Sequence, residues 1–190
     1  MILGFMQYFP FKGENGEKEP TNFREKILAS QGLVRWQHNG QWYITDLNAV
    51  NKEAIFNGDE SNLKPDFTPK IHTFRADPHN RWKAGMKVSM VYRGAGYKIL
   101  DWFNEGIPEL DTIKSIQKIK IKWIDITVTI EGEKKNMQTP CFFIDEKEQD
   151  LRNFDKIIIN DGFSSMKQFS KWFKKDWSGK ILHFTDFRYE

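Results

Sequence analysis

Apolar and polar residues alternate along several stretches of the chain, and this pattern predicts a strand-rich protein. In residues 86–93 (MKVSMVYR), apolar side chains fall on one strand face and mostly polar ones on the other. Residues 119–123 and 124–130 are also apolar at alternate positions, but with opposite parity. We therefore expect a bulge or a sharp bend at the Trp123–Ile124 step. Residues 131–136 predict a turn into a partner strand at 137–145.

Helical spacing follows an apolar N-terminal stretch and returns near the C-terminus. Residues 1–11 predict an inner strand, and Asn22 and Glu25 have the spacing of a capping box for a helix that ends near Gly32. Residues 164–175 (SSMKQFSKWFKK) combine a serine N-cap with one apolar helical stripe. We expect Gly179 to end this helix before a closing strand at residues 180–187.

Between the first helix and Lys70 the periodicity weakens. Residues 33–46 predict a hairpin that turns at Asn39–Gly40, and a short helical piece and a polar loop follow. A chain of 190 residues suits one domain with a sizeable core. We therefore expect a single domain over residues 1–190, with an insertion at about residues 33–69.

Composition narrows the class of protein. Apolar residues make up 39% of the chain and charged residues 29%, which argues against disorder, and the single cysteine, Cys141, excludes an internal disulfide. No run approaches the roughly 18 apolar residues of a membrane span, and the N-terminus lacks the basic leader of a signal peptide. We expect a soluble, cytoplasmic protein that does not engage a membrane. The net charge of +3 is too small by itself to indicate nucleic-acid binding.

The stretch KIHTFR at residues 70–75 holds the strongest candidate chemistry. Strand alternation places Thr73 and Arg75 on one face, while Lys70 lies in the preceding turn, from which its side chain can reach Thr73. A desolvated lysine beside a hydroxyl can form a base-and-nucleophile pair for acyl transfer. Asp161, at the entry to the last helix, is the candidate acid. The alternative is a strand start with solvated charges and a plain turn at Asp161.

Nearby residues suggest a metal site, but their spacing does not support one. His72, Asp77 and His79 flank a proline-containing turn and match no usual ligand spacing, so we expect neither a metal nor another cofactor. Trp82 is the aromatic residue best placed to contact a ligand, followed by Trp36 and Trp42.

Lysines cluster in two places that could follow a phosphate backbone. Lys118, Lys120 and Lys122 alternate on one strand face, and Lys167 and Lys171 lie on the last helix. These five residues are candidate nucleic-acid contacts. The alternative is that they form solvated surfaces.

The order of these motifs resembles the ASCH domain family. FREKIL (23–28), KIHTFR (70–75), RWKAGMKVSM (81–90), NDGFSSMKQF (160–169) and KILHFTDF (180–187) follow the family's order, and the resemblance covers most of the chain outside residues 33–68. It implies an α+β fold built on a PUA-like β-barrel with peripheral helices.

The branch of the family most similar to this chain is the N4-acetylcytidine amidohydrolases. By that resemblance Lys70 is the activating base, Thr73 the nucleophile and Asp161, in place of a glutamate, the acid; Arg75 holds the substrate. Two functions stay open: hydrolysis of an N-acyl group from a modified cytidine, and non-catalytic binding of RNA or a modified base. The expected partner is RNA or a nucleoside. A third possibility is a protein-interaction module.

Overall fold

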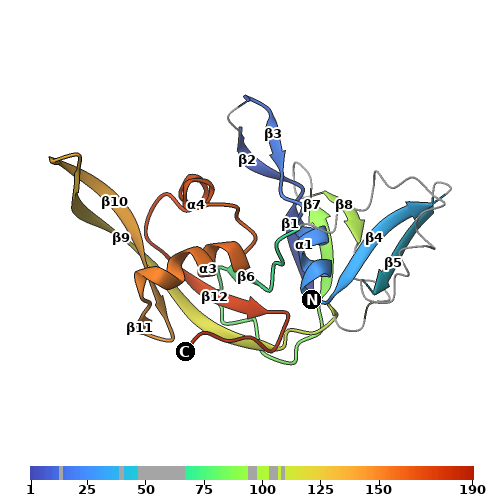
Figure 1. Ribbon diagram of the computed structural model, residues 1–190. Helices are drawn as coiled ribbons and strands as arrows, with labels where there is room; N and C mark the ends of the chain where they lie inside the picture. The colour runs from blue at the N-terminus through green and yellow to red at the C-terminus, as the bar shows by residue number, and fades with distance from the viewer. Residues whose placement is uncertain (13–14, 39–40, 47–66, 94–97, 103–106, 108–109) are drawn as a thin grey trace.

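Strands provide most of the regular structure, as the alternating pattern predicts, and three α-helices accompany them in the described part of the chain (Figure 1). The structure is a computed structural model, and it describes residues 1–12, 15–38, 41–46, 67–93, 98–102, 107 and 110–190. The fold class is α+β, which confirms the coarse expectation.

The largest sheet has five strands, and all its pairings are antiparallel. Its order is β11-β10-β9-β12-β6. The strands are β6 (His72–Arg75), β9 (Ser115–Ile130), β10 (Glu133–Ile144), β11 (Lys147–Glu148) and β12 (Trp177–His183). Because β12 is paired on both sides, it joins the long β9–β10 hairpin to β6, the strand that contains Thr73 and Arg75.

The remaining strands form a smaller sheet and two hairpins. The smaller sheet has the order β1-β7-β8, with β1 parallel to β7. Its strands are β1 (Ile2–Met6), β7 (Ser89–Arg93) and β8 (Ile99–Trp102). The hairpins pair β2 (Tyr8–Lys12) with β3 (Lys18–Pro20) and β4 (Leu33–His38) with β5 (Gln41–Asp46). The N-terminal strand is thus at the edge of its described sheet and is not an inner strand.

Two of the three described α-helices cover one face of the large sheet. These are α3 (Phe154–Asn160), which follows the short 3-10 helix η4 (Leu151–Asn153), and α4 (Met166–Trp172), whereas α1 (Phe23–Ser30) lies beside the smaller sheet (Figure 1). The Phe142 ring of β10 lies 4.9 Å from Phe154 of α3 and 5.4 Å from Phe169 of α4, measured between ring centroids. These contacts place α3 and α4 over the same face, which leaves the opposite face to charged side chains.

Of the bulge or sharp bend expected at the Trp123–Ile124 step, the bulge is absent from β9. Its register with β10 runs without a shift from Ile119 to Ile130, whereas its pairing with β12 ends at Ile121. Beyond that point β9 and β10 project from the body as a two-stranded ribbon (Figure 1). Neither face of such a ribbon is tied to the core, so the parity of apolar residues can change there without a bulge.

Two predicted helix ends are wrong. Asn22 precedes α1 with φ 51° and makes no side-chain cap, so the capping box does not form. The first helical amides are instead met by other groups, since Tyr92 Oη accepts from the Arg24 backbone N–H at 2.8 Å. The last helix ends at Trp172, although Ser165 caps its start as expected.

Gly179 lies within β12 and not at the end of a helix, and its lack of a side chain leaves room for neighbouring atoms. A Cβ atom at this position would overlap the backbone carbonyl of Arg75 and the Trp177 ring. Glycine therefore permits the close approach of β6 and β12 and does not act as a helix stop.

The predicted hairpin in the first half of the insertion is confirmed by the pairing of β4 and β5, which begins at His38 and Gln41. The turn residues Asn39 and Gly40 lie outside the described residues, as do residues 47–66 of the insertion. The described sheets are open, so the barrel remains a prediction.

Candidate functional site

Lys70, Thr73, Arg75 and Asp161 line one cavity of about 410 Å³. The walls between these polar residues are largely aromatic and include Phe5, Phe23, Phe163 and Trp172. A volume in the range of roughly 300–1,000 Å³, with apolar walls and a few convergent polar groups, is typical of small-molecule sites. The structure thus brings together the four residues that the sequence singled out in residues 70–75 and at Asp161.

Backbone contacts with two helices place Lys70 at the base of the cavity. Its N–H donates to the Lys26 carbonyl in the middle of α1 at 2.9 Å, and the next N–H, of Ile71, donates to the Asn160 carbonyl at the end of α3 at 3.1 Å. Asp161 is the C-terminal cap of α3, and Gly162 follows with φ 94°. A Cβ atom at Gly162 would also crowd Phe23 and Lys70, so glycine is required there for both conformation and space.

Lys70 and Asp161 form a buried ion pair. Lys70 is 1% exposed, and its Nζ lies 3.0 Å from Asp161 Oδ1. The same ammonium donates to the Asp161 backbone carbonyl and lies 4.6 Å from the centre of the Phe23 ring. Asp161 Oδ1 also accepts from the Phe74 backbone N–H at 2.8 Å. The lysine is therefore not the solvated strand residue of the alternative interpretation.

Burial changes the acid–base properties of both partners. Desolvation lowers the pKa of Lys70 to about 8, although the charge of Asp161 opposes that shift. Burial by itself raises the pKa of Asp161, but Lys70 and His72 outweigh it and hold the pKa below its usual value. At neutral pH the carboxylate is therefore ionised, and a small fraction of the lysine is neutral and able to accept a proton.

His72 and Tyr189 extend this polar cluster, and sequence reasoning did not assign either to the site. His72 is fully buried; its Nδ1 lies 3.6 Å from Asp161 Oδ1, too far for a good hydrogen bond, and its Nε2 lies 2.8 Å from Tyr189 Oη. Asn160 Nδ2 donates to the same Tyr189 oxygen at 2.8 Å. If Tyr189 donates its hydroxyl proton to Nε2, His72 carries its own proton on Nδ1, directed at Asp161.

Trp82 lies apart from the cavity. Its side chain is 7% exposed within the hydrophobic core, and its carbonyl accepts from Lys180 Nζ at 2.8 Å. The residues of the suggested metal site also have separate contacts, because Asp77 pairs with Lys180 at 2.8 Å while His72 faces Asp161. The side chains of Trp36 and Trp42 lie outside the description of the structure.

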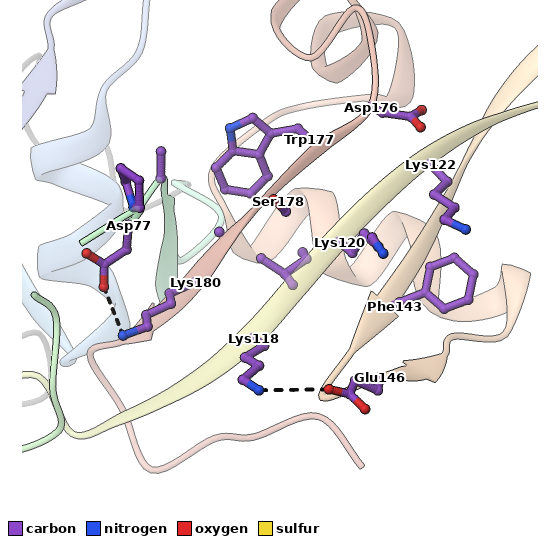
Figure 2. Close-up of a pocket in the computed structure, with 14 residues that line it drawn as sticks. Asp77, Lys118, Lys120, Lys122, Phe143, Glu146, Asp176, Trp177, Ser178 and Lys180 are labelled. Carbon is purple, nitrogen blue, oxygen red and sulfur yellow. Dashed lines mark ion pairs between the residues drawn. The ribbon is translucent and has the colours of Figure 1, made fainter. Parts of the chain in front are cut away.

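The lysines of β9 line a second, larger hollow of about 870 Å³ on the outer face of the sheet (Figure 2). Lys118, Lys120 and Lys122 are exposed, and Lys180 of β12 joins them because it is paired with Lys118 in the sheet. The Phe143 ring of β10 lies among them, 5.6 Å from Lys122 Nζ. Carboxylates also border the hollow: Glu146 lies 3.8 Å from Lys118 Nζ, and Asp77 binds Lys180.

The two lysines predicted on the last helix are not part of that hollow. Lys167 and Lys171 belong to α4, and Lys171 Nζ lies 5.3 Å from the centre of the Phe11 ring of β2. The five candidate nucleic-acid contacts therefore occupy two separate surfaces.

Within the described residues, each helix is too short or too polar to span a bilayer.

The chain was also compared with known proteins. Comparisons with protein-family models, with curated proteins and with solved structures found no match.

Proposed function

We propose that the cavity binds a modified cytidine and hydrolyses its N-acyl amide bond, as the resemblance to the ASCH amidohydrolases implies. The observation that carries this proposal is the convergence of Lys70, Thr73 and Asp161 on one aromatic-walled cavity, with a lysine whose pKa is lowered to about 8. Aromatic walls suit a planar base, and a partly neutral lysine can activate a hydroxyl.

In the proposed reaction, neutral Lys70 takes the proton of the Thr73 hydroxyl while Oγ1 bonds to the acyl carbon. The tetrahedral intermediate then collapses, and protonated Lys70 donates the proton to the departing amino nitrogen of the base. Water, deprotonated by Lys70, cleaves the acyl ester, releases the free acid and restores Thr73. Because Asp161 is ionised, it serves to orient Lys70 and stabilise its cationic form, and the leaving group receives its proton from the lysine.

This mechanism predicts how the rate depends on pH. Cytidine release from N4-acetylcytidine should increase about tenfold per pH unit below pH 8 and level off above it, because only neutral Lys70 acts as base. Initial rates between pH 6 and pH 9.5, with circular dichroism at each pH to confirm folding, would test this. A rate that is flat or falls across that interval would contradict the role of Lys70 as base.

A second candidate function is RNA binding without catalysis. It is favoured by the alternate lysines of the outer hollow, since residues two apart on a strand lie roughly 6.7 Å apart, close to the spacing of phosphates on an extended nucleic-acid strand. Lys120 and Lys122 flank the Phe143 ring, which could stack on a base. The carboxylates around the hollow limit this surface to a modest positive charge.

Neutralisation of the lysines tests that second function. Lys120→Gln with Lys122→Gln should weaken binding of single-stranded RNA and reduce the slope of log affinity against log salt by about 0.7 per lost phosphate contact. The matched control is Lys134→Gln with Lys135→Gln, which removes two exposed charges from the projecting ribbon. Equal losses in both double variants would show that the hollow has no special part in RNA binding.

The resemblance also extends to the fold. We propose that the five-stranded and three-stranded sheets correspond to parts of a PUA-like barrel. The contacts of Arg75 on β6 with Gly4 and Phe5 on β1 support this arrangement, because they connect the two sheets beside the cavity that both line.

A further inference from the structure

The projecting part of the β9–β10 ribbon has one polar face whose residues bond to one another. Thr127 Oγ1 of β9 donates to Asn136 Oδ1 of β10 at 2.8 Å. Gln138 Nε2 of β10 donates to Asp125 Oδ1 of β9 at 3.0 Å. Both pairs are directly opposite in the register, so their side chains share a face of the ribbon. This face satisfies its own polar groups and is suited to contact with water.

The other face of the ribbon is apolar at its centre. Ile126 is directly opposite Met137 in the register, and Ile124 and Val128 lie two residues to either side of Ile126. Met137 is 48% exposed and Ile124 39%, while Ile126 and Val128 are half-buried. A two-stranded ribbon is at best marginally stable in water by itself. An exposed apolar face on such a ribbon therefore favours a partner that covers it.

Opposite charges lie at the two ends of this apolar face. Lys122, at the base of the ribbon, is exposed on the outer face of the sheet (Figure 2) and has the parity of Ile124. Glu133, at the tip, is opposite Ile130 in the register and so shares the face. Lys135 Nζ lies 3.8 Å from Glu133 on the same face, but both side chains are largely exposed, and such pairs are weak. From base to tip the face thus presents a lysine, an apolar centre and a glutamate.

We propose that this face packs against the same face of a second copy of the chain, in a dimer whose two-fold axis passes near Ile126. Lys122 lies four positions before Ile126, and Glu133 is level with residue 130, four positions after it. Two ribbons packed antiparallel therefore bring the apolar centres together and place Lys122 of each copy over Glu133 of the other. The face matches itself in both apolarity and charge. This dimer does not depend on the proposed hydrolysis.

The contact between the two copies is small. From Lys122 to its tip the ribbon is roughly 30 Å long and about 10 Å wide, so each copy contributes about 300 Å². Stable dimers ordinarily bury about 800 Å² or more per copy, so we expect a weak dimer with a dissociation constant of about 10–100 μM. Its population should therefore rise steeply with protein concentration.

Sedimentation velocity of the full chain, at concentrations from about 1 to 500 μM, tests the dimer. Ile126→Lys should weaken the association at least about tenfold, because it places two like charges in the apolar centre of the contact. The matched control is Thr127→Lys, which adds the same charge to the polar face of the ribbon and should leave the association unchanged. Circular dichroism confirms that each variant is folded.

Charge reversal gives a second test, which a folding defect cannot imitate. Lys122→Glu alone and Glu133→Lys alone each bring like charges together at both ends of the contact, so each should weaken the association at least about tenfold. An equal mixture of the two variants should associate like the unmodified protein, because opposite charges then meet at both ends.

Three results would overturn parts of this proposal. A chain that stays monomeric up to about 500 μM would overturn the dimer itself. Association that persists in Ile126→Lys would overturn the assignment to this face, as edge-to-edge pairing of the strands would produce. Failure of the mixed charge variants to associate would overturn the antiparallel two-fold arrangement. None of these results bears on the cavity, where hydrolysis is assayed separately.

Discussion

Replacement of Lys70 by methionine is expected to lower the free energy of unfolding by about 3–5 kcal/mol, the largest stability effect we predict. Methionine keeps much of the volume of the side chain but removes the charge, so Asp161 is left ionised, buried and without its cation. The Asp161 backbone carbonyl also loses its Lys70 donor. Chemical denaturation monitored by circular dichroism would measure the loss.

Two further variants distinguish a broken ion pair from a simple packing defect. Lys70→Met combined with Asp161→Asn should recover part of the stability, because asparagine carries no charge and can still accept from the Phe74 N–H. Lys26→Met is the matched control, since Lys26 Nζ is partly buried nearby but bonds only to the Gly162 carbonyl in the described contacts. If Lys26→Met costs as much as Lys70→Met, the buried pair has no special importance.

Replacement of Thr73 by valine is expected to reduce cytidine release from N4-acetylcytidine at least about a thousandfold, because it removes the proposed nucleophile. Thr73 is 3% exposed at the cavity wall, and valine has nearly the same shape. The melting temperature should therefore change little, in contrast to the Lys70 variant. Initial rates and thermal unfolding on the same preparations would give both results.

Thr73→Ser is the control for the chemistry, since it retains a hydroxyl at the same position. We expect this variant to keep activity within about tenfold of the unmodified protein. Equal activity in the valine and serine variants would show that Thr73 is not the nucleophile, even if hydrolysis itself is real.

Strand parity made part of the site predictable from the sequence. The alternation in KIHTFR placed Thr73 and Arg75 on one side of β6, and both reach the same cavity. His72 and Phe74 have the opposite parity and their rings stack with centroids 5.2 Å apart, but parity did not predict that Phe74 also lines the cavity or that His72 faces Asp161. The lysines of β9 were recognised in the same way, because Ile119 and Ile121 are buried while the alternate residues, Lys118, Lys120 and Lys122, are exposed.

The rest of the site depends on contacts between distant parts of the chain, which local patterns do not contain. Tyr189 reaches His72 across 117 positions, and Arg75 reaches Gly4 across 71. A single sequence offers no signal for such pairs. For Trp82, a local pattern suggested a contact that does not form. Its position soon after KIHTFR in the sequence suggested a ligand contact, but its side chain packs in the hydrophobic core.

The most direct test of the proposed hydrolysis is incubation of the purified protein with N4-acetylcytidine at pH 8, followed by quantification of cytidine and acetate. The account predicts that both products accumulate in equal amounts, with more than one turnover per protein molecule. A protein that is folded by circular dichroism but releases no cytidine would contradict it, and the cavity would then be a binding site that contains these residues without the reaction.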